Sequence, residues 1–509
     1  MRVQQSGGTS ASTARSNTLP LLLGLIFLAA FGLGYLAQQQ HWGEALAAGV
    51  QAWARSPKTA LTAWRARQQL PTLTVDLRFA DYERLSSARE RALQQGVYVP
   101  LPEEAVTARV TFADARGQVA AELRLPGGAV QGAADAGWTL ELRPAGARAW
   151  RRLTPVVDAA LAWRQWGYLE TLRRNGFAAA TLEPVRLTVN GSSWGLYLLE
   201  TPVTEALTVG FDARAAWQAL AEGEVLADGG FRYAAPAVSA ADDPAAPAAW
   251  ATLDAAFEGE RALSSVTDAE ALGRFVALTM LWTGAPAPDW ASLRWSYDPA
   301  TGQLAPLGSA QPADIAPLPE AFFDDPAVQT AIARALVAYS QPGFLETLRG
   351  EFGADLEAQG YVLGGAARPG GDPWQALTAH QRAMRARVAP EHPLRAMLEP
   401  AGEDFVLRLT SLQPFPLEVT GLDVGGVARR ALDPAWVRSE DRALLLKAEN
   451  ALVLRAMDGE LPQTVELLLP REALAPGGEL TLFCRVWDAN TPEGRVAVLE
   501  TLPLFEETP

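Results

Sequence analysis

Alternating hydrophobic and polar positions predict short strands and hairpins through the middle of the chain. The segment TLTVDLRF at residues 72–79 alternates as a half-buried strand does. A hairpin is expected over residues 105–128, turning at DARG, and residues 137–144 predict one further strand. Residues 185–202, VRLTVNGSSWGLYLLETP, predict a hairpin with an Asn-Gly turn, whose second strand ends on a single carboxylate, Glu200.

Hydrophobic residues at three- and four-residue spacing predict helices between these strands. Helices are expected over residues 81–95, 161–174 and 268–282, and several more between residues 325 and 389. Residues 292–308 predict a second hairpin, which turns at DPATG. The mixture of helices and hairpins indicates an α+β domain.

The pattern changes to short strands separated by turns from about residue 398 onwards. Segments such as DFVLRLTSL (residues 404–412), LEVTGLDV (417–424) and LTLFCRVWD (480–488) have the period-2 pattern of strands. Strands at this spacing predict a small β-sandwich. The one cysteine of the chain, Cys484, falls in an apolar strand and is expected to be a buried structural thiol.

The N-terminal pattern predicts a membrane anchor. Residues 19–37 carry no charge, and this length is enough to span a bilayer. Arg2 and Arg15 precede the segment without any acidic residue, which predicts a cytoplasmic N-terminus and an extracytoplasmic bulk. A cleaved signal peptide is the alternative, although Tyr35 fits poorly at the −3 position of a cleavage site.

The expected organisation therefore has five parts. They are a cytoplasmic tail (residues 1–18), a single-pass transmembrane anchor (19–37), a helical stalk broken near Pro57 (38–70), a central domain (71–392) and a β-sandwich domain (393–509).

Composition and charge narrow the class of function. The chain has 509 residues and a formal net charge of −15, which argues against nucleic acid as a partner. One cysteine and three scattered histidines argue against a zinc site. Lysine occurs only as Lys58 and Lys447, so arginine supplies nearly all positive charge.

The order of segments resembles one family, the spore coat protein H (CotH) kinase-like family. The resemblance extends from about residue 73 to residue 388 and includes LTVDLRFADYERL, AELRLPGG and GWTLELRP. Its best segment is LTVNGSSWGLYLLETPV, in which the family's positions are filled by Asn190, Gly191, Gly195, Tyr197 and Glu200.

This resemblance implies an atypical protein-kinase fold, so the expected fold class is α+β: a kinase-like domain after a transmembrane helix, followed by a small β-sandwich. It also implies ATP and Mg²⁺ as cofactors and phosphate transfer to serine on coat or surface proteins. Glu200 would then lie near the nucleotide.

Phosphoryl transfer requires cations for the phosphates and carboxylates for the metal ions. The lysine that the family uses is absent, and Arg124 and Arg143 are the candidates to replace it at a cofactor site, although arginine is bulkier and more rigid. The family's Asp-x-Asp metal motif is replaced in QLAPLGSAQPADIA, where Asp314 comes later in a Pro-rich stretch. No metal ligand is therefore predicted.

Two carboxylates keep positions that could be catalytic, Glu200 and Asp289. Asp289 lies in PDWASLRW, where Ser292 or a neighbour stands in place of the asparagine of the family. A capping or turn role for Asp289 and a structural role for Glu200 are the alternatives.

The leading interpretation is a degraded kinase that acts as a scaffold for a surface or envelope protein partner. The alternatives are an active serine kinase that uses arginines and displaced acids, and a carbohydrate-binding surface protein that uses the β-sandwich. The 16 tryptophans invite the last interpretation, but Trp163 and Trp166 fall on a predicted amphipathic helix and are expected to be core residues.

Overall fold

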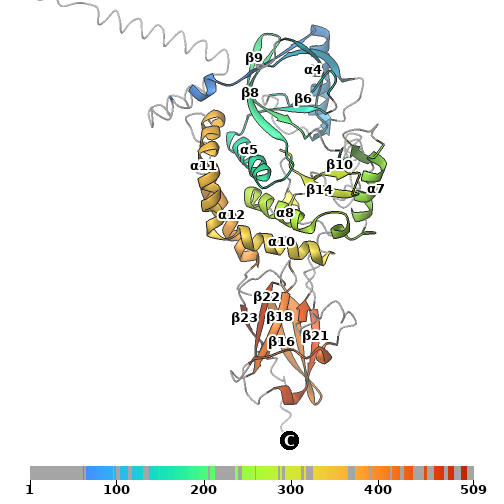
Figure 1. The fold of residues 1–509 in the computed structure, drawn as a ribbon, viewed down its shortest axis with the longest axis vertical. Coiled ribbons are helices and arrows are strands. Elements are labelled where there is room, and N and C mark those ends of the chain that lie inside the picture. Colours follow the sequence, from blue (N-terminus) through green and yellow to red (C-terminus); the bar gives the residue numbers. More distant parts are fainter. Residues whose placement is uncertain are drawn as a thin grey trace, which may run out of the picture.

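The structure is a computed structural model. It describes residue 61 and residues 65–500 except 96, 99–103, 113–116, 130–136, 148, 204–206, 213–234, 239–243, 258, 285–286, 289–292, 311–314, 317–324, 365–372, 389–392, 413–414, 416, 425–428, 439–451, 455–463, 475–479 and 487–493. The described parts form a β-barrel, a mostly helical body and a pair of β-sheets, arranged in this order along the long axis of the molecule (Figure 1).

Seven strands form a closed barrel. In spatial order they are β1 (Thr72–Leu77), β3 (Val106–Thr111), β4 (Val119–Arg124), β6 (Leu140–Pro144), β7 (Arg151–Pro155), β9 (Ser192–Thr201) and β8 (Thr181–Val189). Neighbouring strands are antiparallel except for β1 and β8, which pair in parallel and close the sheet. In this parallel pair Val75 lies opposite Val189, and both side chains are buried in the barrel core.

The predicted Asn-Gly hairpin is confirmed as the connection between β8 and β9. Asn190 and Gly191 both have positive φ angles, 49° and 77°, as a two-residue turn of the I′ type requires. Asparagine tolerates this conformation better than most residues, and its Oδ1 accepts a hydrogen bond from the Leu77 N–H at 2.7 Å. The turn is thereby attached to the end of the neighbouring strand β1.

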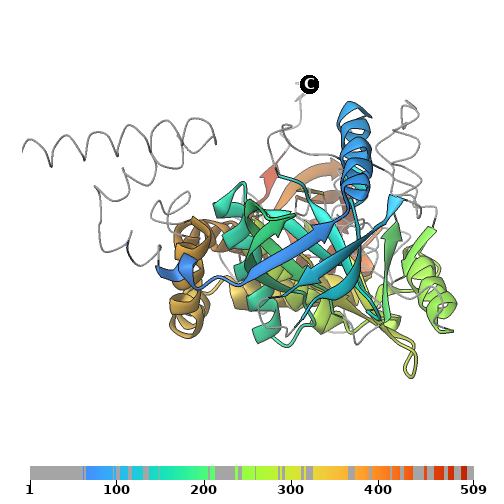
Figure 2. The same cartoon turned by 90° about the horizontal axis from the view of Figure 1, so that it is seen from above.

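Helix α4 (Phe79–Gln95) covers one side of the barrel (Figure 2). Its buried residues, Leu85, Ala88 and Ala92, belong to the same hydrophobic cluster as the interior of the barrel. The small pair β2 (Val97–Tyr98) and β5 (Gly128–Ala129) follows it. The predicted helix over residues 81–95 is confirmed.

The helical body contains α5 (Ala159–Arg174), α7 (Ala246–Phe257), α8 (Ala269–Thr283), α10 (Pro326–Tyr339), α11 (Pro342–Gly364) and α12 (Pro373–Val388), with the 3₁₀ turn η3 (Leu263–Ser265). A four-stranded sheet lies beside them in the order β11 (Ala235–Val238), β10 (Leu207–Asp212), β13 (Arg294–Asp298) and β14 (Gln303–Leu307), and β12 (Ala287–Pro288) pairs with β15 (Ile315–Ala316).

Side chains of this body cap the ends of its helices. Asp268 accepts hydrogen bonds from two backbone N–H groups at the start of α8, and Asp325 does the same for α10. At the other end of α10, the Gln381 amide donates to the carbonyls of Tyr339 and Gln341 at 2.9 and 2.7 Å. These bonds satisfy backbone groups that the helices leave without partners.

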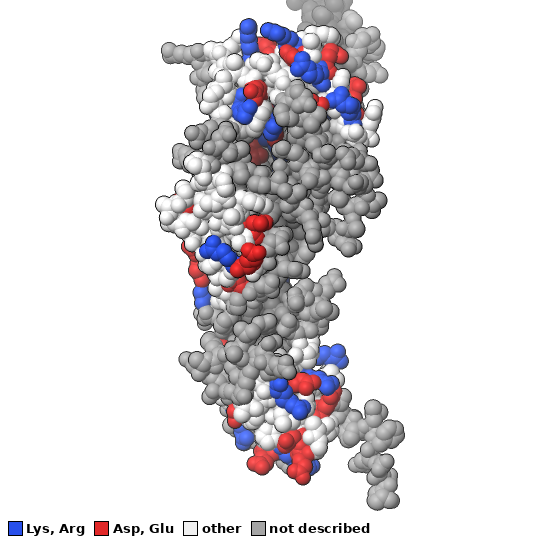
Figure 3. Space-filling model, turned by 90° about the vertical axis from the view of Figure 1, so that its right-hand side faces the viewer, with Lys and Arg blue, Asp and Glu red and all other residues white. Residues whose placement is uncertain are grey.

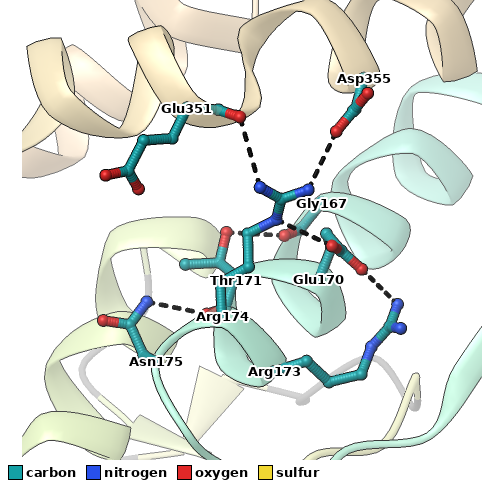
Figure 4. Close-up of polar contacts among 8 residues, drawn as sticks. All are labelled: Gly167, Glu170, Thr171, Arg173, Arg174, Asn175, Glu351 and Asp355. Carbon is teal, nitrogen blue, oxygen red and sulfur yellow. Dashed lines mark hydrogen bonds and ion pairs between the residues drawn. The ribbon is translucent and has the colours of Figure 1, made fainter.

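Helix α5 is attached to α11 through polar contacts, of which those of Arg174 are shown in Figure 4. Arg174 pairs with Glu170 on its own helix at 2.8 Å and with Asp355 of α11 at 2.9 Å, and it also donates to the Glu351 carbonyl. Trp163 is buried and donates to the Leu356 carbonyl at 2.5 Å. Its position confirms the prediction that this tryptophan is a core residue.

Trp166 also belongs to this interface. It is half-buried and stacks on Phe352 of α11, with ring centroids 5.5 Å apart. Both tryptophans of α5 therefore serve helix packing rather than ligand binding.

The C-terminal part consists of two sheets. One has the order β21 (Thr464–Leu469), β17 (Asp404–Ser411), β16 (Leu394–Ala401), β24 (Leu499–Glu500), and the other has β19 (Arg429–Arg430), β18 (Leu417–Val424), β22 (Leu480–Val486), β23 (Gly494–Ala497), with β20 (Leu452–Leu454) also on β18. The short 3₁₀ turns η4 (Pro434–Trp436) and η5 (Arg471–Ala473) connect strands. Cys484 is buried on β22, as predicted.

The predicted fold class was wrong in two respects. The first half of the central domain is a closed seven-stranded barrel rather than the expected kinase-like arrangement. The reason is the parallel pairing of β1 with residues 186–189, which lie more than a hundred positions further along the chain and carry no local signal of it.

The predicted transmembrane helix is the second correction. Among the described residues, no helix is both long and apolar enough to cross a bilayer. The longest of those discussed above, α11, has 23 residues and carries charged residues along its length, including Glu346, Arg349 and Asp355. The segment on which the prediction rested, residues 19–37, lies outside the described residues, as does the expected stalk up to residue 60.

Two helical glycines provide a test of the packing of the body. A Cβ built on Gly273 of α8 would lie 2.5 Å from the Ala331 backbone of α10, whereas one on Gly350 of α11 would meet nothing within 4 Å. We expect Gly273→Ala to lower the free energy of unfolding by roughly 1–3 kcal/mol through overpacking. Gly350→Ala is the matched control and should raise it by about 0.5–1 kcal/mol. Urea unfolding measures both, and equal effects would contradict this packing.

Candidate functional site

The candidate site lies on the outer face of the barrel, where four neighbouring strands carry charged residues in register. Arg124 of β4 lies opposite Glu141 of β6, Glu141 opposite Arg152 of β7, and Arg152 opposite Glu200 of β9. We call these four residues the charge ladder. Because side chains alternate between the two faces of a strand, the neighbouring leucines, such as Leu142, point into the barrel.

The centre of the charge ladder is Glu141. Its carboxylate accepts from Arg124 Nε at 2.8 Å and from Arg152 Nη2 at 3.3 Å. The Glu141 side chain is 13% exposed, while those of Arg124 and Arg152 are 27% and 26% exposed. An ion pair that is partly removed from water holds its partners more firmly than a surface pair does.

A second row of side chains lies beside the charge ladder, two residues away along each strand. Arg143 of β6 forms an ion pair with Glu122 of β4, its partner in register. The ring of Trp150, just before β7, has the guanidinium carbon of Arg124 4.0 Å from its centroid and that of Arg143 at 4.7 Å. Both guanidinium groups can therefore interact with the negative face of the indole.

The two rows are electrically balanced. Three arginines are matched by three carboxylates, with Glu122 and Glu141 held in ion pairs and Glu200 at the end of the ladder. On the face of the molecule shown in Figure 3, basic and acidic side chains are likewise mixed at the barrel end. This balance leaves little net positive potential for a polyanion.

Glu200 does not point into open solvent but contacts the segment that follows β14. Its Oε1 accepts from the Ala310 N–H at 3.1 Å, while Gln165 of α5 donates to the Ala310 carbonyl at 2.7 Å. Both backbone groups of Ala310 are thus bound by side chains, one from the barrel and one from the helical body. Glu200 acts here as a link between these two parts.

The same segment is fixed two residues earlier at Gly308. Its N–H donates to the Ala178 carbonyl at 2.9 Å, and its carbonyl accepts from the Ala180 N–H at 3.0 Å. A Cβ built on Gly308 would lie 2.6 Å from Leu172 Cδ1 and 2.8 Å from the Cβ of Ala179. There is consequently no room for any side chain at this position.

Two of the four predicted site residues, Arg124 and Arg143, are brought together at Trp150, and Glu200 lies two strands away from Arg143. Arg124, Arg143 and Glu200 all lie on the outer face of strands β4, β6 and β9, although Arg124 and Arg143 contact carboxylates and an indole there. Asp289 lies outside the described residues, as does Asp314. What Asp289 does stays a prediction.

Sequence reasoning missed Glu141, Arg152 and Trp150. A signal for Glu141 exists in the alternation of charged and apolar residues in LELRP, which places its charges on one face of the strand. AWRRLTP gives no such signal, because Arg151 and Arg152 are adjacent. The sequence does not give the register between strands, and the register is what makes these residues neighbours.

Among the described residues, no set of side chains is assembled for ATP and magnesium. Within the described ranges, no group of three or more His, Cys, Asp and Glu side chains is placed to hold a metal ion. The arginines that were candidates for the phosphates already bind carboxylates, and a guanidinium in such a pair would have to leave it to reach a phosphate.

Comparison with protein-family models and with curated proteins gives no match to this chain. The resemblance to the CotH family therefore stays a prediction.

The charge ladder predicts unequal effects for two neutralising substitutions. Glu141→Gln leaves two partly buried arginines without their shared carboxylate, and we expect it to lower the free energy of unfolding by roughly 1–3 kcal/mol. Glu122→Gln is the matched control on the same face, where the carboxylate is 49% exposed, and should change it by less than about 0.5 kcal/mol. Chemical denaturation of the two variants decides the point, and equal losses would contradict the central role of Glu141.

Proposed function

We propose that this chain is a binding scaffold that does not transfer phosphate. The observation that carries the proposal is the mutual neutralisation of the candidate site: Arg124 and Arg143 are paired with carboxylates, and Glu200 is bonded to the Ala310 backbone. Catalysis of phosphoryl transfer needs cations and metal-binding carboxylates that are aimed at the substrate. Here the charged groups are aimed at one another.

The segment from Gly308 to Ala310 adds to this argument. In the family that the sequence resembles, this stretch is where the metal-binding aspartates are expected. Gly308 has no room for a side chain, and both polar backbone groups of Ala310 are occupied. The stretch serves as a structural joint between β14, α5 and the barrel.

A scaffold acts through the surfaces it presents rather than through a reaction. The partner that we propose is a protein of the cell surface or envelope, which is the partner class that the family resemblance implies. The continuous hydrophobic cluster that includes residues of both the helical body and the C-terminal sheets supports this role, because it joins these parts into one long support.

The direct test is a phosphorylation assay with the purified full-length chain, labelled ATP, Mg²⁺ and casein as the acceptor. We expect incorporation no higher than in the reaction without the chain, both for the wild type and for Glu200→Ala. An unrelated active serine kinase is the positive control. Robust transfer by the wild type that is lost in Glu200→Ala would overturn the proposal.

The structural joint at Gly308 can be tested separately. Gly308→Ala forces a Cβ against Leu172 and Ala179, so we expect a loss of roughly 1–3 kcal/mol in unfolding free energy. Ser309→Ala, one position away, removes a hydroxyl that makes no hydrogen bond to the described residues and should have a much smaller effect. Thermal unfolding compares the two, and a fully stable Gly308→Ala variant would show that a side chain can be accommodated.

A further inference from the structure

The chain contains two Asn-Gly pairs, and the fold places them in opposite surroundings. They are Asn175-Gly176 and Asn190-Gly191, and no other asparagine of the chain precedes a glycine. Because glycine has no side chain, its backbone nitrogen can approach the side-chain amide of the asparagine before it. Asparagine is a thermolabile residue, and such pairs are where this chemistry is least hindered.

The reaction open to an Asn-Gly pair is deamidation. The glycine backbone nitrogen gives its proton to hydroxide and attacks Cγ of the asparagine, so that a new N–C bond forms and the Cγ–Nδ2 bond breaks. The amide nitrogen takes a proton from water and leaves as ammonia, and a five-membered cyclic imide remains. Water then opens the imide at either of its two carbonyl carbons, which gives aspartate or isoaspartate. Water is the only co-reactant.

Both reacting nitrogens are held at the first pair. Asn175 ends helix α5, and its Nδ2 donates to the Thr171 carbonyl at 2.8 Å, as Figure 4 shows. The Gly176 N–H donates to the Arg173 carbonyl at 3.1 Å. These bonds satisfy carbonyl groups that the last turn of the helix leaves without partners. Deamidation of Asn175 would therefore have to break the end of α5.

Neither reacting nitrogen is held at the second pair. Asn190 and Gly191 are both exposed. Among the described residues, no acceptor lies within hydrogen-bond distance of the Gly191 N–H or of Asn190 Nδ2. In a two-residue hairpin turn the flanking residues pair with each other, and here these are Val189 and Ser192. The nucleophile and the leaving group can react without losing a hydrogen bond.

The barrel also polarises the side-chain carbonyl of Asn190. Its Oδ1 accepts from the Leu77 N–H at 2.7 Å, at the end of β1. Attack on Cγ places negative charge on this oxygen, and a fixed backbone donor stabilises such a charge as the donors of an oxyanion hole do. The Oδ1 atom of Asn175 has no such donor in the part of the chain that the structure describes.

We propose that Asn190 is a site of spontaneous deamidation and that the fold selects it over Asn175. Three groups decide the rate, the nucleophile, the leaving group and the carbonyl, and all three favour Asn190. The turn has to rotate for the Gly191 nitrogen to reach Cγ, and an exposed turn opens at lower cost than a packed helix end. The inference does not depend on the proposed scaffold function.

Deamidation would weaken the closure of the barrel. The Asn190 backbone N–H donates to the Val75 carbonyl at 3.0 Å, and its Oδ1 binds the Leu77 N–H, so the residue is attached to β1 twice. Isoaspartate adds a carbon atom to the main chain, and a two-residue turn cannot accept it without moving these groups. The parallel pair of β1 and β8 ends at this point, with Val75 opposite Val189.

The test is peptide mapping by mass spectrometry of the full-length chain before and after incubation at mildly alkaline pH. Cleavage after arginine places the two asparagines on separate peptides, residues 175–186 and 187–214, and neither peptide contains another asparagine or a glutamine. We expect the amide to be replaced by a carboxylate at Asn190 at least about tenfold faster than at Asn175. In urea the two rates should become similar, because neither pair is then held by the fold.

Asn190→Gly is the matched control variant. Glycine adopts the positive φ of this position, Gly-Gly is also favoured in a two-residue turn, and no side-chain amide remains to react. Incubation should lower the midpoint of thermal unfolding of the wild type and leave that of Asn190→Gly unchanged.

Faster reaction at Asn190 in the native chain, similar rates in urea and a stable Asn190→Gly variant support the proposal. It is overturned if Asn190 in the native chain reacts no faster than Asn175. It is also overturned if the same ratio of rates persists in urea, because local sequence and not the fold would then set the rates. Equal losses of thermal stability in the wild type and in Asn190→Gly would contradict the effect on barrel closure.

Discussion

The parallel pairing of β1 with β8 is the contact on which the first half of this molecule depends. It joins residues 72–75 to residues 186–189 and turns a seven-stranded sheet into a closed barrel. Closure removes the exposed edges that a sheet would otherwise present. It also gives every strand an inner and an outer face, so that each residue on it is committed to the core or to the surface. The hairpin of β8 and β9, whose second strand carries Glu200, supplies two strands of this barrel.

The division into two faces explains why the barrel has a hydrophobic interior and a charged outer surface. Inward positions hold Leu123, Leu142 and Leu153 of the buried cluster. Outward positions hold charges, and these lie opposite one another because the strands are in register. Shifting any one strand by one residue would exchange the two sets. The charge ladder and the hydrophobic interior therefore stabilise the same register.

Local features of the fold could be predicted from the sequence. The turn at Asn190 and Gly191, the helices that begin at capping aspartates such as Asp268, and the buried Cys484 all have a signal within a few residues. Barrel closure could not be predicted, because it depends on a pairing between distant segments whose strand patterns are individually ordinary. The roles of Arg124 and Arg143 were missed for the same reason, since their carboxylate partners lie on other strands and the register is a property of the whole sheet.

On the barrel, arginine makes contacts that lysine could not make. A lysine ammonium is a compact point charge, whereas the planar guanidinium of arginine offers several donors in fixed directions. Arg124 uses that shape to reach the Glu141 carboxylate while its guanidinium lies over Trp150. The same rigidity makes arginine a poor replacement for a lysine at a compact phosphate contact. Arginine thus weakens the catalytic interpretation, and the same residue type forms the ion pairs and indole contacts on the outer face of the barrel. A lysine at residue 124 could form an ion pair with Glu141, but it could not lay a planar group on the indole at the same time.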